Sequence, residues 1–265
     1  MDDYKNKEAL ADLYLNQKLS TIDIGKIFNV TSTTILYFMG KYEIPRRSKS
    51  QSVALGRANS CNIDENAFDF LCGEVLGDMY IGTHHGHSGL IGYGTKYLSY
   101  AEWLLGQLRI MGIELAGRIH SIIDKRWGCK SYRFYTKSYT DLVLLRNMFY
   151  PKGKKIVPDE VALNPLTLRQ LYIGDGSLKS THGGRYKHIQ IASCGFDIDS
   201  VNILVDKLNN IGFIASRWPS NNAIGISTNS VVDFLDYIGP CPVQCYSYKW
   251  ATKNRKGQLE IPLKN

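Results

Sequence analysis

The sequence predicts an α+β fold, in which two copies of an αββαββα repeat form a pseudo-twofold pair behind a small all-α module at the N-terminus. The pair is predicted by two apolar, helix-like stretches at 71–79 and 168–176, because each contains a Gly-Asp pair at the same point. Amphipathic stretches at 100–113 and 200–213 then follow at matching distances. Internal repetition of this kind indicates one structural unit used twice. Three short apolar clusters before residue 47 predict the helical module.

These observations divide the chain into four segments. We expect a helix-turn-helix module over 1–47, a polar linker over 48–62, a first repeat over 63–160 and a second repeat over 161–265. Two repeats in one chain are the internal equivalent of a symmetric dimer, so the predicted state is a monomer.

The N-terminal module has the layout of helix, short helix, turn and helix. Ser20 and Thr21 are candidate N-caps for the second helix, and a third helix begins after Asn29-Val30. In a helix-turn-helix module the start of that last helix faces bases in the major groove. The candidate base- and phosphate-contacting residues are Thr31, Ser32, Thr33, Thr34 and Tyr37, followed by Arg46 and Arg47 as a basic arm suited to a narrow minor groove. The alternative is a structural three-helix cap with a solvated polar face.

Composition narrows the class of protein. The 265 residues contain 32 Lys and Arg against 24 Asp and Glu, a net charge of +8, which favours a polyanionic partner such as nucleic acid. No apolar run reaches the roughly 18 residues of a membrane span, and the first residues lack a secretory h-region. We therefore expect no membrane association and no secretion.

The six cysteines form no CxxC pair and are predicted to be reduced thiols. The alternative is a zinc site with poor ligand spacing, for which the candidates are Cys241, Cys245, His84, His85 and His87.

The two apolar helices carry the predicted chemistry. Gly73 and Gly77 fall on one helix face and leave room for a partner backbone, and Gly174 does the same in the second copy. Gln170 stands where a small residue is expected opposite Gly73, so we expect asymmetric packing there, with room for a hydrogen bond.

Asp78 and Asp175 are each predicted at the C-terminal end of a helix, where the macrodipole disfavours an anion. Two carboxylates meeting at this axis repel unless a cation neutralises them, and oxygen ligands with waters suit Mg²⁺. The metal site is predicted at Asp78 and Asp175 with the adjoining Gly77 and Gly174. Hard cations beside paired carboxylates suit phosphodiester hydrolysis. The alternative is a buried apolar helix pair with polar C-terminal caps.

The motifs LCGEVLGDM at 71–79 and LRQLYIGDG at 168–176 resemble the repeated motif of the LAGLIDADG homing endonucleases. Residues 149–178 and the CYSYKW segment at 245–250 are similar to the two-motif, intron-encoded members. The resemblance implies the LAGLIDADG homing endonuclease fold and site-specific cleavage of double-stranded DNA across the minor groove, with Mg²⁺ or another divalent cation such as Mn²⁺. It also implies short 3′ overhangs, intron homing, and a location in the cytoplasm of a bacterial or phage-infected cell or in an organellar matrix.

By the same resemblance, Lys155 and Lys249 are one catalytic lysine per half, with Lys154 as the neighbour that could be confused with Lys155. A phosphate-contacting or merely exposed lysine is the alternative. Two other functions remain open: an RNA maturase that assists splicing, and a non-catalytic DNA-binding transcription regulator.

DNA contacts are expected from outward-facing residues of the strands, because alternation sends every second side chain to the same face. In 186–193, Ile189 and Ile191 are predicted to face the helices. The candidate DNA-binding residues of this domain are Arg118, His120, Arg133, Lys179, Arg185, His188, Gln190 and Arg217. An ordinary solvated sheet face is the alternative for each.

Overall fold

A computed structural model describes residues 3–49, 51–52, 59–84, 86–123, 128–181, 186–250, 252–253 and 259–260. The chain forms two compact units. One comprises Met1–Ala58 with His84–Ser88, and the other Asn59–Thr83 with Gly89–Asn265. None of the helices in the described ranges is long and apolar enough to cross a membrane.

The N-terminal unit is helical. Its elements are the 3-10 turn η1 (Asp3–Lys5), α1 (Lys7–Ala11), the π-helical turn η2 (Asp12–Asn16), α2 (Thr21–Ile27) and α3 (Ser32–Lys41). Ser20 and Thr31 cap α2 and α3, because their hydroxyls accept the backbone N–H groups of Asp23 and Thr34. Ser20 is thus the N-cap that the sequence indicates for the second helix, and Thr21 is that helix's first residue.

A tight turn joins α2 to α3. Asn29 in this turn has a φ of 54°, a conformation that asparagine tolerates better than most residues. Gly25 is required by the same turn, because a Cβ there would lie 2.6 Å from the Val30 carbonyl oxygen. Leu10, Ile24, Ile35 and Met39 share the fully buried core beneath these helices.

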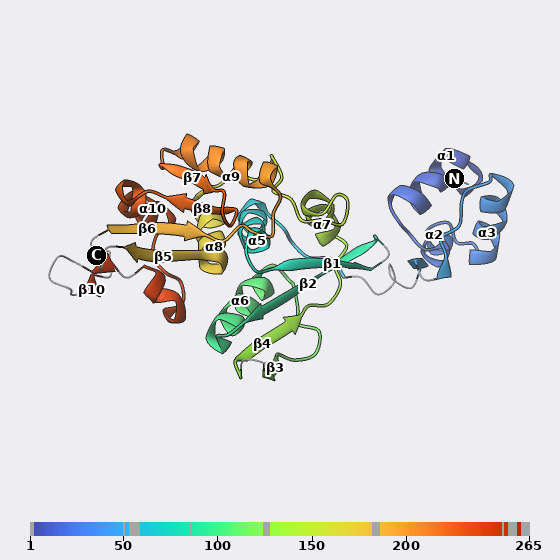
Figure 1. Ribbon diagram of the computed structural model, residues 1–265. Coiled ribbons are helices and arrows are strands. Elements are labelled where there is room, and N and C mark those ends of the chain that lie inside the picture. Colours follow the sequence, from blue (N-terminus) through green and yellow to red (C-terminus); the bar gives the residue numbers. More distant parts are fainter. Residues whose placement is uncertain are drawn as a thin grey trace. The chain divides into compact units, whose positions relative to one another are not determined.

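The other unit contains the predicted repeat, shown in Figure 1. The first copy consists of α5 (Glu65–Leu76), β1 (Tyr80–His84), β2 (Ser88–Thr95), α6 (Leu98–Ile110), β3 (His120–Ile123), β4 (Lys130–Tyr135) and α7 (Leu142–Phe149). The second consists of α8 (Pro165–Asp175), β5 (Gly176–Thr181), β6 (Tyr186–Ile191), α9 (Ile198–Ile211), β7 (Ala215–Trp218), β8 (Ala223–Ile226), η4 (Thr228–Ser230) and α10 (Val231–Ile238). The short elements η5 (Gln244–Lys249), β9 (Thr252–Lys253) and β10 (Leu259–Glu260) follow. The predicted αββαββα order is therefore confirmed in both copies.

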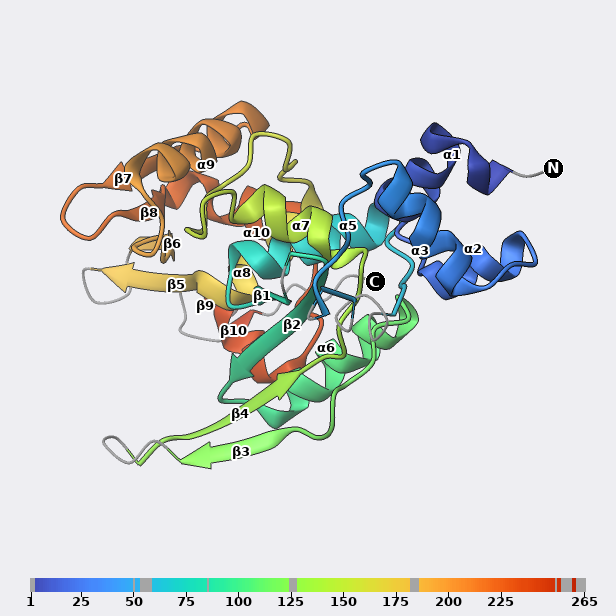
Figure 2. The same ribbon diagram turned by 90° about the vertical axis from the view of Figure 1, so that its right-hand side faces the viewer.

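The two four-stranded antiparallel sheets have the same strand order, β1-β2-β4-β3 and β5-β6-β8-β7. In each copy the later helices pack on one face of the sheet, with α6 against β4, and α9 and α10 against β7 and β6 (Figure 2). The buried residues of both copies form one core. One face of each sheet is therefore covered by helices.

Helices α5 and α8 lie side by side at the centre of this unit (Figure 1). Asp64 and Asn164 cap their N-termini in the same way, each accepting the N–H of the residue three positions on. A Cβ on Gly73 would lie 2.4 Å from the Thr167 carbonyl oxygen and 2.8 Å from the Gln170 Cβ. The predicted close, asymmetric approach at Gly73 and Gln170 is present. The predicted room for a hydrogen bond is not used by the described residues, because among them neither polar atom of the Gln170 amide has a hydrogen-bond partner.

The two central helices end differently. Asp175 is the last residue of α8, but α5 ends at Leu76, and Asp78 lies two residues beyond it. Gly77, the C-cap of α5, has a ψ of −128° and takes the chain out of the helix early. In the second copy Gly176 passes so close to the Tyr172 ring that a Cβ would lie 2.0 Å from it. Met79 occupies the corresponding place in the first copy and is buried.

Candidate active site

Two aspartates meet where α5 and α8 end. The helices touch through glycines here, since a Cβ on Gly77 would lie 3.4 Å from the Gly174 Cα. A Cβ on Gly174 would in turn lie 3.2 Å from the backbone nitrogen of Asp78. Asp78 and Asp175 directly follow these glycines, so the close approach of the backbones brings both carboxyl groups to the pseudo-twofold axis.

In each copy, one lysine contacts the C-terminal end of that copy's central helix. Lys155 Nζ donates to the carbonyl oxygen of Gly77 at 2.9 Å and to that of Leu76 at 3.4 Å. Lys249 Nζ donates to the carbonyl oxygens of Tyr172, Ile173 and Gly174. These carbonyls carry the partial negative charge of the helix C-terminus, so each cation compensates the end of its own helix.

The surroundings of the two lysines are also alike. Lys155 Nζ lies 5.1 Å from the centre of the Phe196 ring, and Lys249 Nζ lies 4.9 Å from that of the Tyr246 ring. Lys154, the neighbour that could be confused with Lys155, instead pairs with Asp197 at 3.6 Å. Of the two adjacent lysines, only Lys155 contacts the end of α5.

The four ionisable groups influence one another. Burial raises the pKa of Asp175 to about 6, with a further contribution from the charge of Asp78, while the two lysines act in the opposite direction. Burial also raises the pKa of Asp78, against the same two lysines. Burial lowers the pKa values of Lys155 and Lys249 to about 8, and both aspartates oppose that shift. Each copy thus supplies a carboxyl group and an amine whose pKa values are displaced towards neutrality.

The donor set suits a hard divalent cation. Asp78 and Asp175 offer carboxylate oxygens at one point, and the Gly77 and Gly174 carbonyls lie beside them, although both carbonyls accept lysine hydrogen bonds. Oxygen ligands completed by water match the preferences of Mg²⁺. Within the described residues, no group of three or more His, Cys, Asp or Glu side chains gathers as for a metal. The zinc alternative therefore has no ligand set among them, and His85 and the side chain of His84 lie outside what the structure describes.

The outer faces of the two sheets carry five of the eight DNA-binding residues predicted for this domain. His120 pairs with Arg133 across β3 and β4, and Lys179 pairs with His188 across β5 and β6. Ile189 and Ile191 are fully buried, as predicted, and Gln190 between them faces outward. Arg118 is exposed just before β3, and Arg185 lies outside the described residues.

The predicted outward orientation of Arg217 is wrong. It pairs with Ile224, which itself pairs with the fully buried Ile191, and cross-strand partners share a face of the sheet. Its side chain therefore belongs to the helix-covered face, where it is half-buried and donates to Asn222 at 3.3 Å. Trp218 faces outward instead and packs edge-on against the His188 ring.

The expectation that Arg47 belongs to a free basic arm also needs correction. Its guanidinium lies 4.0 Å from the centre of the Tyr14 ring and donates to the carbonyl oxygens of Tyr14, Lys18 and Leu19. It closes the helical module internally and is not part of a free basic arm, whereas Arg46 is exposed and donates to one carbonyl.

The other candidates in the helical module lie at the start of α3. Thr31 uses its hydroxyl to cap the helix, and it also contacts the Thr34 hydroxyl at 3.0 Å. Thr33 is exposed, Ser32 is half-buried, and Tyr37 is 67% exposed one turn after Thr33. The exposed face of α3 is therefore formed by Thr33 and Tyr37.

Sequence reasoning missed two kinds of functional candidate. Tyr80, Tyr135 and Tyr186 are exposed aromatic side chains on the sheets, and period-two alternation from Arg133 would have found Tyr135. Glu74 is a buried carboxyl group inside α5 that accepts a 2.6 Å hydrogen bond from Tyr100, and burial raises its pKa to about 8. Its presence in the otherwise apolar second half of α5, residues 70–76, was the available signal.

Sequence comparison gives the class of protein to which this chain belongs. The profile of the LAGLIDADG DNA endonuclease family matches residues 68–234, more than half of the chain. The chain belongs to this family.

Its relatives include the uncharacterized protein MJ1098 of Methanocaldococcus jannaschii, which is 31% identical over 151 residues, or 56% of this chain. The matched region spans 57% of the length of that curated relative. Among solved structures, the homing endonuclease I-WcaI, bound to its DNA recognition sequence, matches with a TM-score of 0.61 and 18% identity, covering 79% of this chain and 96% of that one. The N-terminal LAGLIDADG domain of DUF199/WhiA matches with a TM-score of 0.46 and 13% identity, covering 76% and 95%. The I-WcaI match shows a shared fold.

Proposed function

We propose that this chain is a site-specific double-strand DNA endonuclease of the homing type, which acts as a monomer and hydrolyses one strand with each half. The observation that carries the proposal is the duplicated Asp–Lys arrangement, Asp78 with Lys155 and Asp175 with Lys249, at the ends of two helices in contact. Family membership and the fold shared with a DNA-bound homing endonuclease support a duplex DNA substrate.

The side chains have separate roles in this proposal. Asp78 and Asp175, with the adjoining Gly77 and Gly174 carbonyls, hold Mg²⁺ or a similar divalent cation. When bound, the cation supplies positive charge at the scissile phosphate and makes water a better nucleophile. Lys155 and Lys249 are fixed by helix carbonyls and present positive charge where the phosphate gains negative charge in the transition state.

DNA lies along the outer faces of the two sheets in this proposal. Arg133, Lys179 and His188 contact the duplex from those faces, and the N-terminal helical module extends the protected length on one side through the exposed face of α3. Cutting across the minor groove leaves short 3′ overhangs, and the biological outcome is intron homing.

A cleavage assay on a randomised duplex library tests the proposal. We expect discrete double-strand breaks with Mg²⁺ for the native chain, no breaks with Ca²⁺, and none with Asp78→Asn or Asp175→Asn under either cation. The two variants should keep most of their DNA affinity, because they alter the metal ligands and not the sheet faces.

Three results would contradict the proposal. Full cleavage by either asparagine variant would remove the metal assignment. Specific duplex binding without cleavage by the native chain would favour a transcription regulator, and binding of structured intron RNA in preference to duplex DNA would favour a maturase.

A further inference from the structure

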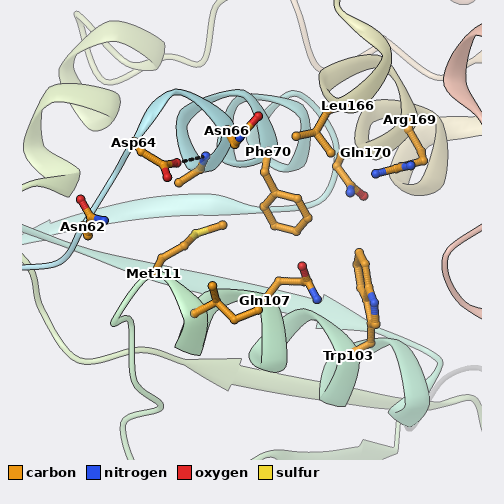
Figure 3. Close-up of a pocket in the computed structure, with 12 residues that line it drawn as sticks. Asn62, Asp64, Asn66, Phe70, Trp103, Gln107, Met111, Leu166, Arg169 and Gln170 are labelled. Carbon is orange, nitrogen blue, oxygen red and sulfur yellow. Dashed lines mark hydrogen bonds between the residues drawn. The ribbon is translucent and has the colours of Figure 1, made fainter.

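A pocket of about 240 Å³ lies between α5, α6 and α8, beside the first halves of the two central helices. Figure 3 shows the residues around it. Phe70 comes from α5, Trp103 and Gln107 from α6, and Arg169 and Gln170 from α8. Asp78 and Asp175 lie at the other ends of α5 and α8, so the pocket does not belong to the candidate active site.

The Gln170 amide points into this pocket (Figure 3). The residue is 1% exposed, and within the described part of the chain neither its amide oxygen nor its amide nitrogen has a hydrogen-bond partner. A buried amide without partners is unfavourable, and such groups in folded proteins are nearly always satisfied. The Gln170 side chain leaves α8 directly against Gly73, because a Cβ on Gly73 would lie 2.8 Å from the Gln170 Cβ, and this contact limits the directions in which the amide can point.

The walls around the amide are aromatic. The Phe70 and Trp103 rings lie 6.0 Å apart at an angle of 54°, and Figure 3 shows Phe70 to the left of Gln170 and Trp103 below it. Flat heterocycles stack on such rings, and an amide presents a donor and an acceptor side by side, as the edge of a nucleobase does. The volume is below that of pockets for drug-sized ligands, which suits one planar ring system.

A cation stands beside the amide. Arg169 lines the pocket and is half-buried, and its Nε has no hydrogen-bond partner among the described residues. The acidic Asp64 lies on the opposite helix, where it caps α5 through the Ala67 N–H. A ligand with a flat base and an anionic group would therefore place the anion towards Arg169.

We propose that this pocket binds a single nucleotide unit, with its base stacked on the Trp103 ring beside Phe70, its base edge hydrogen-bonded to Gln170, and its phosphate beside Arg169. Adenine is the best match, because glutamine can satisfy a donor and an acceptor of its edge together. The unit can be a free mononucleotide or an unpaired base of a nucleic acid, since both present the same chemistry. This inference does not depend on the proposed endonuclease activity.

Isothermal titration calorimetry of the full chain with AMP, ribose 5-phosphate and N-acetyltryptophanamide tests the proposal. We expect saturable one-to-one binding of AMP with a dissociation constant on the order of 0.1 mM, and none of ribose 5-phosphate. Gln170→Met and Trp103→Leu should each weaken AMP binding about tenfold or more, while Trp103→Phe should retain it. Glu102→Gln, an exposed change beside Trp103 on α6, is the matched control.

One further comparison distinguishes a free nucleotide from an unpaired base of a nucleic acid, and another distinguishes this pocket from the candidate active site. An eight-nucleotide single strand that binds more than tenfold tighter than AMP, and is weakened by the same two variants, identifies an unpaired base of a nucleic acid. Equal or weaker binding identifies the free nucleotide. Asp175→Asn should bind AMP like the native chain whether or not it cleaves DNA.

Three results would overturn the proposal. They are the absence of saturable binding by any mononucleotide or single strand, binding that Gln170→Met and Trp103→Leu leave unchanged, and equal affinity for N-acetyltryptophanamide. The last would assign the pocket to an aromatic side chain of a protein partner.

Discussion

Replacing Gly73 by alanine tests whether the close contact between α5 and α8 determines stability. The new methyl group would lie 2.4 Å from the Thr167 carbonyl oxygen, whereas ordinary contacts begin at 3.4 Å, so the backbones must separate by about 1 Å. Overpacking of this kind costs about 1–3 kcal/mol, and the better helix propensity of alanine recovers about 1 kcal/mol at most. We expect a net loss of about 1–2 kcal/mol, and a Tm lowered by about 2–8 °C.

Thermal unfolding followed by circular dichroism measures this effect, and Gly106→Ala is the matched control. Gly106 lies inside α6, and apart from the backbone of its own helix no atom of the described residues lies within 4 Å of its ideal Cβ position. The same methyl group should therefore leave stability unchanged or raise it by up to about 1 kcal/mol. Gly73→Ala should also slow cleavage more than it weakens DNA binding, because small displacements of catalytic groups are costly. A Gly73→Ala chain as stable as the Gly106→Ala chain would refute the reasoning.

Three other predictions follow from the electrostatics and packing. The pKa of Glu74 in the folded chain is raised from 4.5 to about 8. Its contribution to the free energy of unfolding is therefore fully present below about pH 4.5 and is lost as the pH rises through about 8. Glu74→Gln should flatten this part of a stability profile measured by urea unfolding. Arg47→Ala should lower the hydrogen-exchange protection of α1 to α3 by about 1–3 kcal/mol, because three carbonyls lose a charged donor. An equal loss of protection in Arg46→Ala would contradict the structural role given to Arg47. Arg133→Ala should reduce the slope of log affinity against log salt for duplex DNA by about 1, whereas Arg217→Ala, on the helix-covered face, should not change the slope.

The repeat could be predicted from the sequence because its signals are local and occur twice. The Gly-Asp pairs, the amphipathic helices and the alternation around Ile189 each follow from residues close together in the chain. The pairing of Asp78 with Asp175 followed because two equivalent helices had to meet through their glycines.

What could not be predicted depends on contacts between distant residues. Alternation places Arg217 on one face or the other only when its register with Ile224 is known, and that register is set by the turn between β7 and β8. The carbonyls that surround the Arg47 guanidinium belong to residues about 30 positions earlier, and nothing near Arg47 in the sequence indicates them. The pocket at Gln170 likewise requires three helices to be placed before it exists.

At the contact between the two copies, the Gln170 side chain of the second copy fills the space that Gly73 leaves open in the first. Two first copies facing each other would leave a void at this point, and two second copies would force two glutamines into the same space. Each half is thus matched to its counterpart and not to a duplicate of itself. A protein whose halves are no longer interchangeable is free to place different side chains on its two sheets, so under the proposed function nothing in the described part of the architecture requires the target site to be a palindrome.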